Sequence, residues 1–216
     1  MLITFEGIDG SGKTTQAELL TDALQREGWC TKLIDNNSGR PMRQLSRGLI
    51  SSMESFPPPL ASLFLGLSDL SYTIDRLFES FKKENHIIIF DRYIYSAITD
   101  AIALGLSELP IDHLLALFPP PDITVYFAMN PKIALSRKSS ISLAEAGGPE
   151  FVKRNITLVD AFLDFQERVF HAYELLIDRM LIQGNIVQIN SMGNKEEIHQ
   201  FIKGKAIEML QQVFVK

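Results

Sequence analysis

Five short apolar runs occur along the chain, and longer segments with helical periodicity lie between them. The runs are Met1–Phe5, Thr31–Ile34, His86–Phe90, Ile123–Phe127 and Asn185–Ile189. Short apolar runs bounded by turn residues are typical of buried strands. Because each intervening segment has room for a helix, the strands are expected to run parallel in one sheet. The pattern therefore predicts an α/β fold with a central five-stranded parallel sheet.

The clearest helical segment begins at Lys13 and ends before Gly28. Ala17, Leu20 and Leu24 recur in it at spacings of three and four residues, which places them on one face of a helix. A glycine at the end of such a pattern is a common helix stop. The chain is therefore expected to begin with a strand, a glycine-rich turn and a helix that packs on the sheet.

No linker rich in Gly or Ser divides the chain, so we expect a single domain over residues 1–216. The stretch Ser139–Gly148 is rich in Ser, Gly and Ala and lies between two helical patterns. Such a composition is typical of a mobile loop. We therefore expect a lid at about residues 137–155.

The composition restricts the classes of protein that the chain can belong to. It has 216 residues, of which 46% are hydrophobic and 22% charged, as in water-soluble globular proteins. Its net charge of -5 lacks the basic footprint of a nucleic-acid-binding domain, and no apolar run approaches the roughly 18 residues of a membrane span. The one cysteine, Cys30, cannot form an internal disulfide and is expected to be a small buried hydrophobe. We expect a cytoplasmic protein without a nucleic-acid or membrane partner.

The turn after the first strand carries a complete phosphate-binding motif. Gly7-Ile8-Asp9-Gly10-Ser11-Gly12-Lys13-Thr14 matches G-x-x-x-x-G-K-[ST] between a strand and a helix. The glycines let backbone N–H groups face a β-phosphate, and the helix N-terminus adds partial positive charge. Lys13 can reach the β- and γ-phosphates, while the Thr14 hydroxyl can ligate Mg²⁺. The motif predicts ATP and Mg²⁺ as ligands, with a nucleotide-binding set of Gly7, Gly10, Ser11, Gly12, Lys13, Thr14 and Thr15.

A second motif follows the third predicted strand. Asp91-Arg92-Tyr93 stands where a GTPase would carry D-x-x-G, and the late Asn194-Lys195-Glu196-Glu197 falls short of the guanine-reading N-K-x-D. Asn194 is better explained as the N-cap of the last helix, with acids in the first turn. Asp91 and Arg92 place a Mg²⁺-organising carboxylate beside a phosphate-binding cation at the ligand-binding edge of the sheet. This pair indicates a kinase whose acceptor is itself phosphorylated.

In order and spacing, these motifs resemble the signature set of the thymidylate kinase family. The resemblance rests on Phe5–Gln16, Asp75-Arg76, Asp91-Arg92-Tyr93, Pro121-Asp122, Phe165-Gln166 through Tyr173, and Asn190-Ser191. It implies a three-layer P-loop NTPase fold with helices on both faces of the sheet. It also implies transfer of a phosphoryl group from ATP to dTMP, giving ADP and dTDP, by an enzyme that is often a homodimer through helices after the first and third strands.

The resemblance also implies roles for single residues. Asp9 matches the acid that holds the acceptor sugar or its phosphate, and Arg92 matches the arginine that grips the acceptor phosphate. Arg76 matches the arginine that reaches the thymine edge, and Tyr72, one helical turn earlier, occupies the position of an aromatic ring that stacks on the base. Ser96 matches a further family position four residues past Arg92.

Gly10 implies that a lid supplies a catalytic cation, because some family members carry an arginine at this place in the loop. Arg137 is the first choice for that cation, and the alternatives are Lys138, Lys153 and Arg154. The catalytic set expected on this basis is Lys13, Asp9, Asp91, Arg92 and Arg137.

Two departures from the family pattern leave the acceptor open. Arg40, with Arg43 behind it, stands in for an acceptor-phosphate arginine after the second strand, and Asp100 replaces an aromatic residue that lies against the sugar. A carboxylate at that position could accept from a ribose hydroxyl or a base amino group. The leading hypothesis is a dTMP kinase, and the alternatives are a related enzyme for another nucleotide or nucleoside and a non-kinase P-loop protein that binds ATP as a switch.

Overall fold

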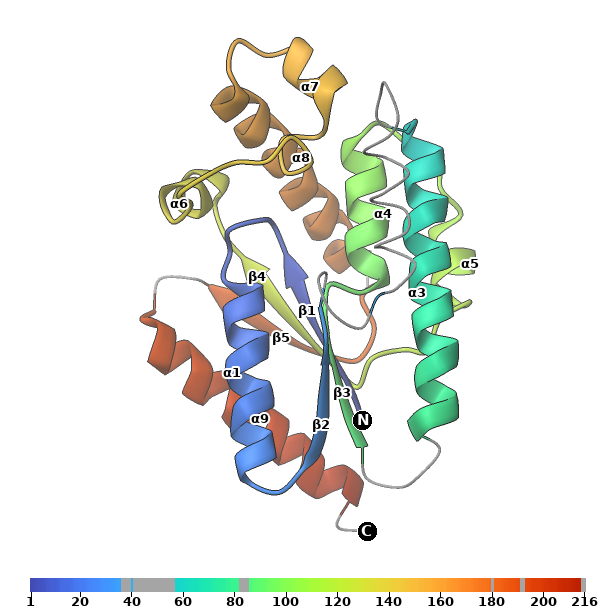
Figure 1. The fold of residues 1–216 in the computed structure, drawn as a ribbon, viewed down its shortest axis with the longest axis vertical. Coiled ribbons are helices and arrows are strands. Elements are labelled where there is room, and N and C mark those ends of the chain that lie inside the picture. Colours follow the sequence, from blue (N-terminus) through green and yellow to red (C-terminus); the bar gives the residue numbers. More distant parts are fainter. Residues whose placement is uncertain (36–39, 41–56, 82–85, 180, 191–192, 215–216) are drawn as a thin grey trace.

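A parallel sheet forms the centre of the computed structural model, which describes the chain except residues 36–39, 41–56, 82–85, 180, 191–192 and 215–216 (Figure 1). All four strand pairs are parallel, in the order β2-β3-β1-β4-β5. The strands are β1 (Leu2–Gly7), β2 (Cys30–Ile34), β3 (His86–Asp91), β4 (Ile123–Ala128) and β5 (Asn185–Asn190). Every predicted strand is confirmed, with bounds that shift by one or two residues.

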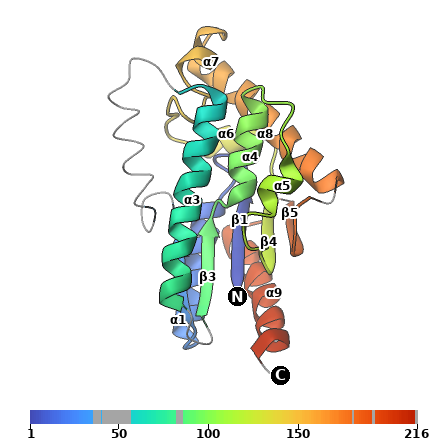
Figure 2. The same ribbon diagram turned by 90° about the vertical axis from the view of Figure 1, so that its right-hand side faces the viewer.

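Helices cover both faces of this sheet (Figures 1 and 2). One face carries α1 and α9, and the other carries α3, α4 and α8. The described helices are α1 (Lys13–Arg26), α3 (Pro59–Phe81), α4 (Ile94–Ala103), α5 (Ile111–Leu115), α6 (Pro131–Ser136), α7 (Pro149–Lys153), α8 (Leu158–Asp178) and α9 (Lys195–Phe214). This arrangement confirms the three-layer α/β fold.

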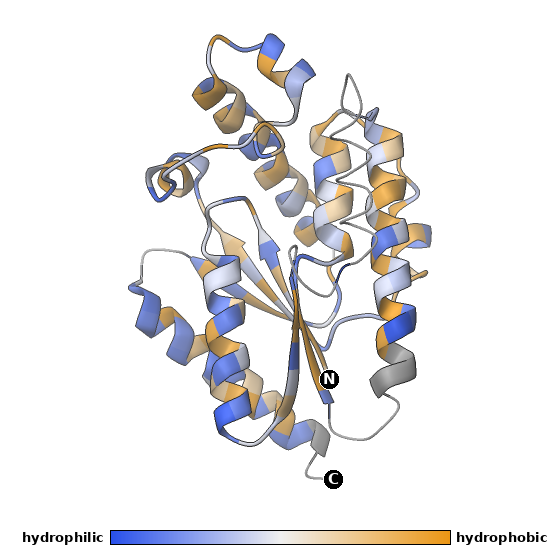
Figure 3. Cartoon of the chain, viewed as in Figure 1, coloured by the Kyte–Doolittle hydropathy of each residue, from blue (hydrophilic) through white to orange (hydrophobic). Residues whose placement is uncertain are grey.

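Successive side chains of each strand point alternately to the two helix layers. In β1, Ile3 and Phe5 pack in the cluster with Leu20 of α1, whereas Glu6 points to the face covered by α4 and α8. Tyr126 of β4 likewise packs on that second face. The three central strands, β1, β3 and β4, are accordingly apolar along most of their length (Figure 3). Because both of their faces are buried, these strands appear in the sequence as apolar runs.

Local residues set both ends of α1 and the start of α9, as predicted. Gly12 precedes α1 with φ 98°, and Gly28, with φ 88°, follows its end. Before α9, Asn194 Oδ1 accepts a hydrogen bond from Glu197 N at 2.9 Å, and Glu197 Oε2 accepts from Asn194 N at 3.2 Å. This reciprocal capping box confirms that the segment with the incomplete guanine motif caps a helix.

The prediction for Cys30 is wrong, because its side chain is exposed. Cys30 is the first residue of β2, which pairs only with β3 among the described strands, and residues on β2 alternate between covered and exposed. An end position on an edge strand leaves its outward side in solvent. Among the described residues, no helix is both long and apolar enough to span a membrane.

Candidate functional site

The loop between β1 and α1 requires glycine at two positions for steric reasons. A Cβ on Gly7 would lie 2.7 Å from the carbonyl oxygen of Phe127, and one on Gly10 would lie 2.8 Å from that of Ala134. Both glycines have positive φ, at 134° and 82°. The loop therefore packs closely against the ends of β4 and α6, and an arginine at position 10 would not fit this arrangement.

The remaining predicted phosphate ligands surround the start of α1. Ser11 is buried, with its Oγ 3.4 Å from Lys13 Nζ, and Gly12 is the N-cap residue. Thr14 and Thr15 are exposed in the first turn of the helix. The unpaired N–H groups of a helix start and an exposed hydroxyl suit an incoming phosphate.

Lys13 is buried below this loop and donates a hydrogen bond to the carbonyl oxygen of Ile8 at 2.6 Å. Burial and the positive charge of Arg92 lower its pKa to about 8, although Asp9 and Asp91 act in the opposite direction. Among the described residues the ammonium group thus contacts the Ile8 carbonyl and Ser11 Oγ and forms no direct ion pair, so a polyphosphate chain would supply an anionic partner.

Thr14 and Asp91 meet at the end of β3 with geometry that suits a magnesium ion. Thr14 Oγ1 donates to Asp91 Oδ2 at 2.6 Å, while the buried Asp91 Oδ1 has no hydrogen-bond partner among the described residues. Groups of three or more His, Cys, Asp or Glu side chains that could hold a metal do not occur among those residues. Mg²⁺ commonly takes one or two protein oxygens together with phosphates and water, so this hydroxyl and carboxylate fit the ion.

Arg92 faces the phosphate loop from the turn after β3. Its guanidinium pairs with the Asp9 carboxylate through NH2 and contacts Ser96 Oγ at 3.4 Å through NH1. Burial opposes the charge of Arg92, but Asp9 and then Asp100 raise its pKa well above the ordinary value. Burial likewise opposes ionisation of Asp9, yet the charges of Arg92 and Lys13 and the hydrogen bond from Arg92 lower the Asp9 pKa. The two predicted acceptor-binding residues are therefore brought together as a charged pair.

The backbone of Arg92 is in an uncommon conformation. Its φ of 74° is the only positive value of a non-glycine residue in the described part of the chain. A left-handed conformation costs a residue of this type on the order of 1–3 kcal/mol and persists where neighbouring contacts impose it. Such outliers often occur at functional sites.

Glu6 anchors this turn, although the sequence analysis gives it no role. Its side chain is fully buried and accepts hydrogen bonds from Tyr93 N at 2.8 Å, Ser96 Oγ at 2.5 Å and Tyr173 Oη at 2.6 Å. Burial raises the pKa of Glu6, and these hydrogen bonds and the charge of Arg92 oppose the rise. The sequence does show a carboxylate inside an apolar strand. Because a buried carboxylate needs hydrogen-bond partners, this position could have been identified as one that contacts polar groups elsewhere in the fold.

Gln166 of α8 connects the phosphate loop to the segment at 137–155. Its Oε1 accepts from Asp9 N at 2.9 Å, and its Nε2 donates to the carbonyl oxygen of Glu145 at 2.8 Å. Nε2 also lies 3.3 Å from Asp9 Oδ2. Gln166 is buried, so these contacts replace its hydration. It belongs to the Phe165-Gln166 motif, but nothing in that motif indicates a bridge between two loops.

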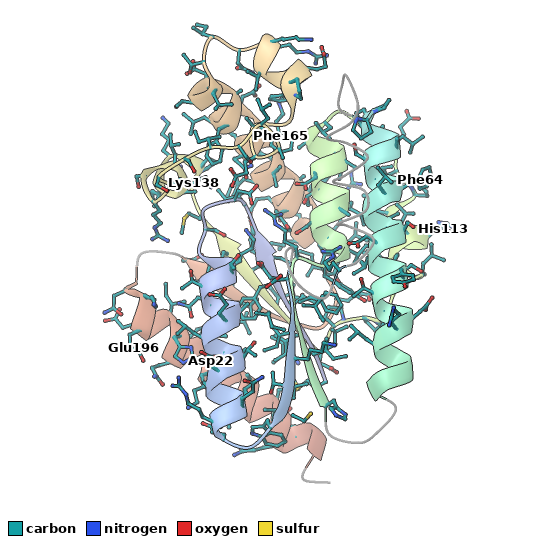
Figure 4. All side chains as sticks on the ribbon, viewed as in Figure 1. Asp22, Phe64, His113, Lys138, Phe165 and Glu196 are labelled. Carbon is teal, nitrogen blue, oxygen red and sulfur yellow. The ribbon has the colours of Figure 1, made fainter. Side chains whose placement is uncertain are left out.

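The segment at 137–155 lies above the phosphate loop and packs on α8 (Figure 1). Ala146 is buried against Phe162, and the ring of Phe151 lies 5.4 Å from that of Phe165, which Figure 4 labels. Residues 139–148, for which the sequence predicts a loop, contain no helix or strand. The C-terminal part of this segment therefore packs against α8.

Of the four predicted lid cations, Lys138 lies against the phosphate loop. Its Cγ lies 3.2 Å from a Cβ built on Gly10, its charge acts on Asp9, and its Nζ pairs with Glu145 Oε1 at 2.6 Å (Figure 4). The other three are exposed: Arg137 at the end of α6, Lys153 in a surface ion pair with Glu150, and Arg154 at the end of α7.

The predicted base-reading pair lies together on α3. Arg76 NH1 donates to Tyr72 Oη at 3.1 Å, and its guanidinium carbon is 5.8 Å from the centre of the tyrosine ring. Both side chains are exposed, and Tyr72 keeps 40% of its surface accessible. The expectation that this i, i+4 pair shares one face is confirmed.

Three predicted acceptor residues have different surroundings. Arg40 is buried and pairs with Asp69 of α3 at 2.6 Å, while Arg43 lies outside the described residues. Ser96 is buried behind Arg92, with its hydroxyl in contact with Glu6. Asp100 is half-buried on α4, and its charge acts on Arg92. Asp100 is thus near Arg92, whereas Arg40 has Asp69 as its described partner.

Comparisons with known proteins agree with this geometry. The family model described as Thymidylate kinase matches residues 5–202. A probable thymidylate kinase of Pyrococcus abyssi is 30% identical over 206 residues, which cover 93% of this chain and 92% of that protein. A thymidylate kinase of Caldanaerobacter subterraneus subsp. tengcongensis is 29% identical over 217 residues, covering 95% and 98% respectively. A probable thymidylate kinase of Sulfolobus acidocaldarius is 37% identical over 136 residues, covering 63% and 68%.

Proposed function

The chain belongs to the thymidylate kinase family, and from this premise we propose that it transfers the γ-phosphoryl group of ATP to dTMP, giving ADP and dTDP. Members of this family are phosphotransferases, and this excludes the alternative of a non-kinase protein that binds ATP as a switch. The observation that carries the proposal is the pairing of Arg92 with Asp9, because it puts an acceptor-binding cation directly against the phosphate loop.

The donor end of the proposed reaction uses the loop and the start of α1. Lys13 would exchange its hydrogen bond to Ile8 for the β- and γ-phosphates, and backbone N–H groups would hold the β-phosphate. Thr14 and Asp91 would hold Mg²⁺, which neutralises charge on the phosphates when bound. These groups position the donor and stabilise charge, and phosphoryl transfer depends mainly on those two contributions.

The acceptor end uses Arg92, Asp9 and the polar pair on α3. Arg92 would bind the phosphate of dTMP, and Asp9 would keep the guanidinium oriented and contact the sugar side. Tyr72 and Arg76 present a ring and a guanidinium on one exposed face for a base. An ionised phosphate oxygen already carries its charge, so the reaction needs no strong general base.

A panel of acceptors tests the proposal. The enzyme is incubated with Mg-ATP and each ribo- and deoxynucleoside monophosphate, and ADP and the diphosphate product are measured together. We expect the highest kcat/KM with dTMP. ATP turnover without any diphosphate product, or transfer only to an unphosphorylated nucleoside, would overturn the assignment.

Asp100 supports one second candidate, an enzyme of the same family that prefers another nucleotide. Its carboxylate is half-buried on α4 and acts electrostatically on Arg92, so it lies near the proposed acceptor. A carboxylate can accept from a ribose hydroxyl or a base amino group. Higher kcat/KM for a ribonucleotide or an amino-bearing base in the same panel would favour this candidate over dTMP.

Residues 137–155 are proposed to act as a lid, with Lys138 as its cation. Lys138 lies over Gly10 and would exchange Glu145 for the donor phosphates when the segment closes, which would exclude water from the reaction. The role of Arg137 as the lid cation stays a prediction from the sequence. Arg137 is exposed at the end of α6, one residue from Lys138, so a variant of it can be compared with a Lys138 variant.

Replacing Lys138 by alanine is expected to lower kcat by about 10²-fold, because it removes one preorganised charge from the transferring group. Arg137→Ala is the matched variant, since it removes a cation one residue away, and we expect it to lower kcat less. Steady-state rates at saturating Mg-ATP and dTMP measure both effects. A larger loss in Arg137→Ala would assign the lid cation to Arg137 instead.

A homodimer is proposed from the exposed apolar side of α3. Leu60 and Phe64 are one helical turn apart and keep 48% and 57% of their surfaces exposed. Figure 4 labels Phe64 on α3. Apolar side chains grouped on a helix are suited to pack against another helix. This surface lies on the helix after β2, whereas the family resemblance pointed to helices after the first and third strands.

Phe64→Lys is expected to convert the dimer to a monomer, as measured by light scattering after gel filtration, because it places a charge in the packed surface. Phe201→Lys on α9 is the control, since Phe201 is also about half exposed, at 51%, but lies on the opposite layer. A monomeric wild-type protein, or dissociation by the control alone, would contradict α3 as the interface.

We further propose a cytoplasmic location and one domain over residues 1–216. The proposed donor, ATP, supports the location, and the packing of α1 to α9 around one sheet supports the domain. A single cooperative unfolding transition would be expected for one domain.

A further inference from the structure

The turn that carries Arg92 is held from β1 on both sides of the Arg92 Cα atom. The Arg92 N–H donates to the carbonyl oxygen of Phe5 at 3.1 Å, and the next N–H, that of Tyr93, donates to Glu6 Oε1 at 2.8 Å. These two bonds orient the peptide units before and after Arg92. Together they determine both backbone dihedrals of this residue, including its left-handed φ of 74°.

Glu6 also reaches the Arg92 side chain through a second atom. Glu6 Oε2 accepts from Ser96 Oγ at 2.5 Å, and Arg92 NH1 contacts the same Ser96 oxygen at 3.4 Å. Tyr173 of α8 completes the group, because its hydroxyl donates to Glu6 Oε2 at 2.6 Å and lies 2.8 Å from Ser96 Oγ. One carboxylate thus controls the backbone of Arg92 and, through Ser96, its guanidinium.

Glu6 cannot itself touch a substrate, because its side chain is fully buried beneath the turn. Burial of a charged group costs free energy unless the group is paired and hydrogen-bonded. The presence of Glu6 here therefore indicates a role that an apolar residue could not fill. Packing alone would be served by a hydrophobic residue, as at Phe5 on the opposite face of the same strand.

We propose that Glu6, joined to Ser96 and Tyr173, is the positioning residue that sets Arg92 to receive the acceptor phosphate. The proposal rests on the proposed function for the identity of the acceptor. Removal of this carboxylate lets the turn relax from its left-handed conformation and moves the guanidinium away from the acceptor position. The donor side is affected less, because Lys13 is held by the carbonyl oxygen of Ile8 in the phosphate loop and Thr14 lies in the first turn of α1.

A double-mutant cycle tests this role. Glu6→Gln is expected to lower kcat/KM for dTMP by about 10²-fold, the loss typical of a reacting group displaced by about 1 Å, while the Kd for Mg-ATP stays within about 2-fold. In an Arg92→Met background the same substitution is expected to lower kcat/KM for dTMP by less than about 2-fold, because the group it positions is gone. A Glu6→Gln loss of equal size in both backgrounds would overturn the proposal.

Two tyrosines supply a milder, matched comparison if Glu6→Gln folds poorly. Tyr173→Phe removes a hydroxyl that binds Glu6 and is expected to lower kcat/KM for dTMP by about 10-fold. Tyr126→Phe removes the hydroxyl of the adjacent buried ring, which donates to Glu174 instead, and should leave this value within about 2-fold. Equal losses in the two variants would indicate a packing defect and contradict the proposal.

A crystal structure of Glu6→Gln separates this inference from the proposed function. We expect Arg92 to leave its left-handed conformation and its contact with Asp9. Retention of both would overturn the positioning role whichever acceptor the enzyme uses. Absence of dTMP phosphorylation by the wild-type enzyme, which involves no variant, would instead overturn the proposed function.

Discussion

Replacing Lys13 by methionine is expected to lower kcat by about 10³-fold, because the variant keeps the buried aliphatic stem and loses the ammonium charge below the phosphate loop. Methionine matches the length and apolar character of the stem, so the thermal midpoint should change little. The lost interaction is stronger in the transition state, where charge moves from the γ-phosphate towards the β-phosphate. Single-turnover rates with Mg-ATP and dTMP measure it.

The pH profile provides a second measurement of Lys13. Its pKa is lowered to about 8, first by burial and then by Arg92, so in the free enzyme the ammonium form dominates below that pH and is lost above it. Since kcat/KM for Mg-ATP reports groups of the free enzyme, it should fall above pH 8 with a slope of one proton. The bound phosphates raise the Lys13 pKa, so kcat at saturation should stay level to higher pH.

This fall of kcat/KM for Mg-ATP above pH 8, the descending limb of the profile, should be missing in Lys13→Met, because the variant has no ammonium group to deprotonate. If the limb persists there, another group titrates and the role of Lys13 in the limb is contradicted. A Lys13→Met variant with kcat within about 10-fold of the wild type would contradict its role in stabilising the transferring group.

The sheet and the phosphate loop could be predicted because their signals are local. A strand buried on both faces appears as an apolar run, and Phe5 and Val125 follow this rule in adjacent strands. The loop is encoded by glycine positions that backbone geometry demands, as at Gly7 and Gly10. Asp91 is the last residue of β3 and Arg92 follows it, and the register of β1 with β3 brings that strand end beside the loop.

The contacts of Glu6 could not be predicted, because they depend on how distant helices pack. Its partners Tyr93, Ser96 and Tyr173 lie 87, 90 and 167 residues away along the chain. A pattern within one segment carries no information on which hydroxyl of α4 or α8 reaches the strand. Gln166 is similar, since its link to Asp9 spans 157 residues.

The surroundings of single residues on predicted elements were also beyond the sequence. Cys30 is exposed because β2 is an edge strand, and the strand order follows from the crossovers rather than from the residues of β2. Lys138 and Arg137 are adjacent cations in the sequence, yet the end of α6 turns Lys138 over Gly10 and leaves Arg137 exposed.

Arg92 is the proposed ligand of the acceptor phosphate, and Arg92→Met is therefore expected to lower kcat/KM for dTMP by about 10³- to 10⁴-fold, as when an arginine that neutralises a transferring phosphoryl group is lost. Methionine retains the apolar stem under the same backbone restraints. Arg92→Lys should recover only part of this loss, because a lysine ammonium cannot reproduce the planar fork that pairs with Asp9 and has further N–H donors for a phosphate. Initial rates at varied dTMP, with Mg-ATP saturating, measure both variants.

The same substitution should move the donor-side pH profile in a defined direction. The charge of Arg92 is the second cause, after burial, that lowers the Lys13 pKa, so its removal raises that pKa. In Arg92→Met the fall of kcat/KM for Mg-ATP should therefore begin above pH 8, at a higher pH than in the wild type. An unchanged limb would show that the two cations are not coupled. An increase in KM for Mg-ATP as large as the increase for dTMP would assign Arg92 to the donor and contradict its place at the acceptor phosphate.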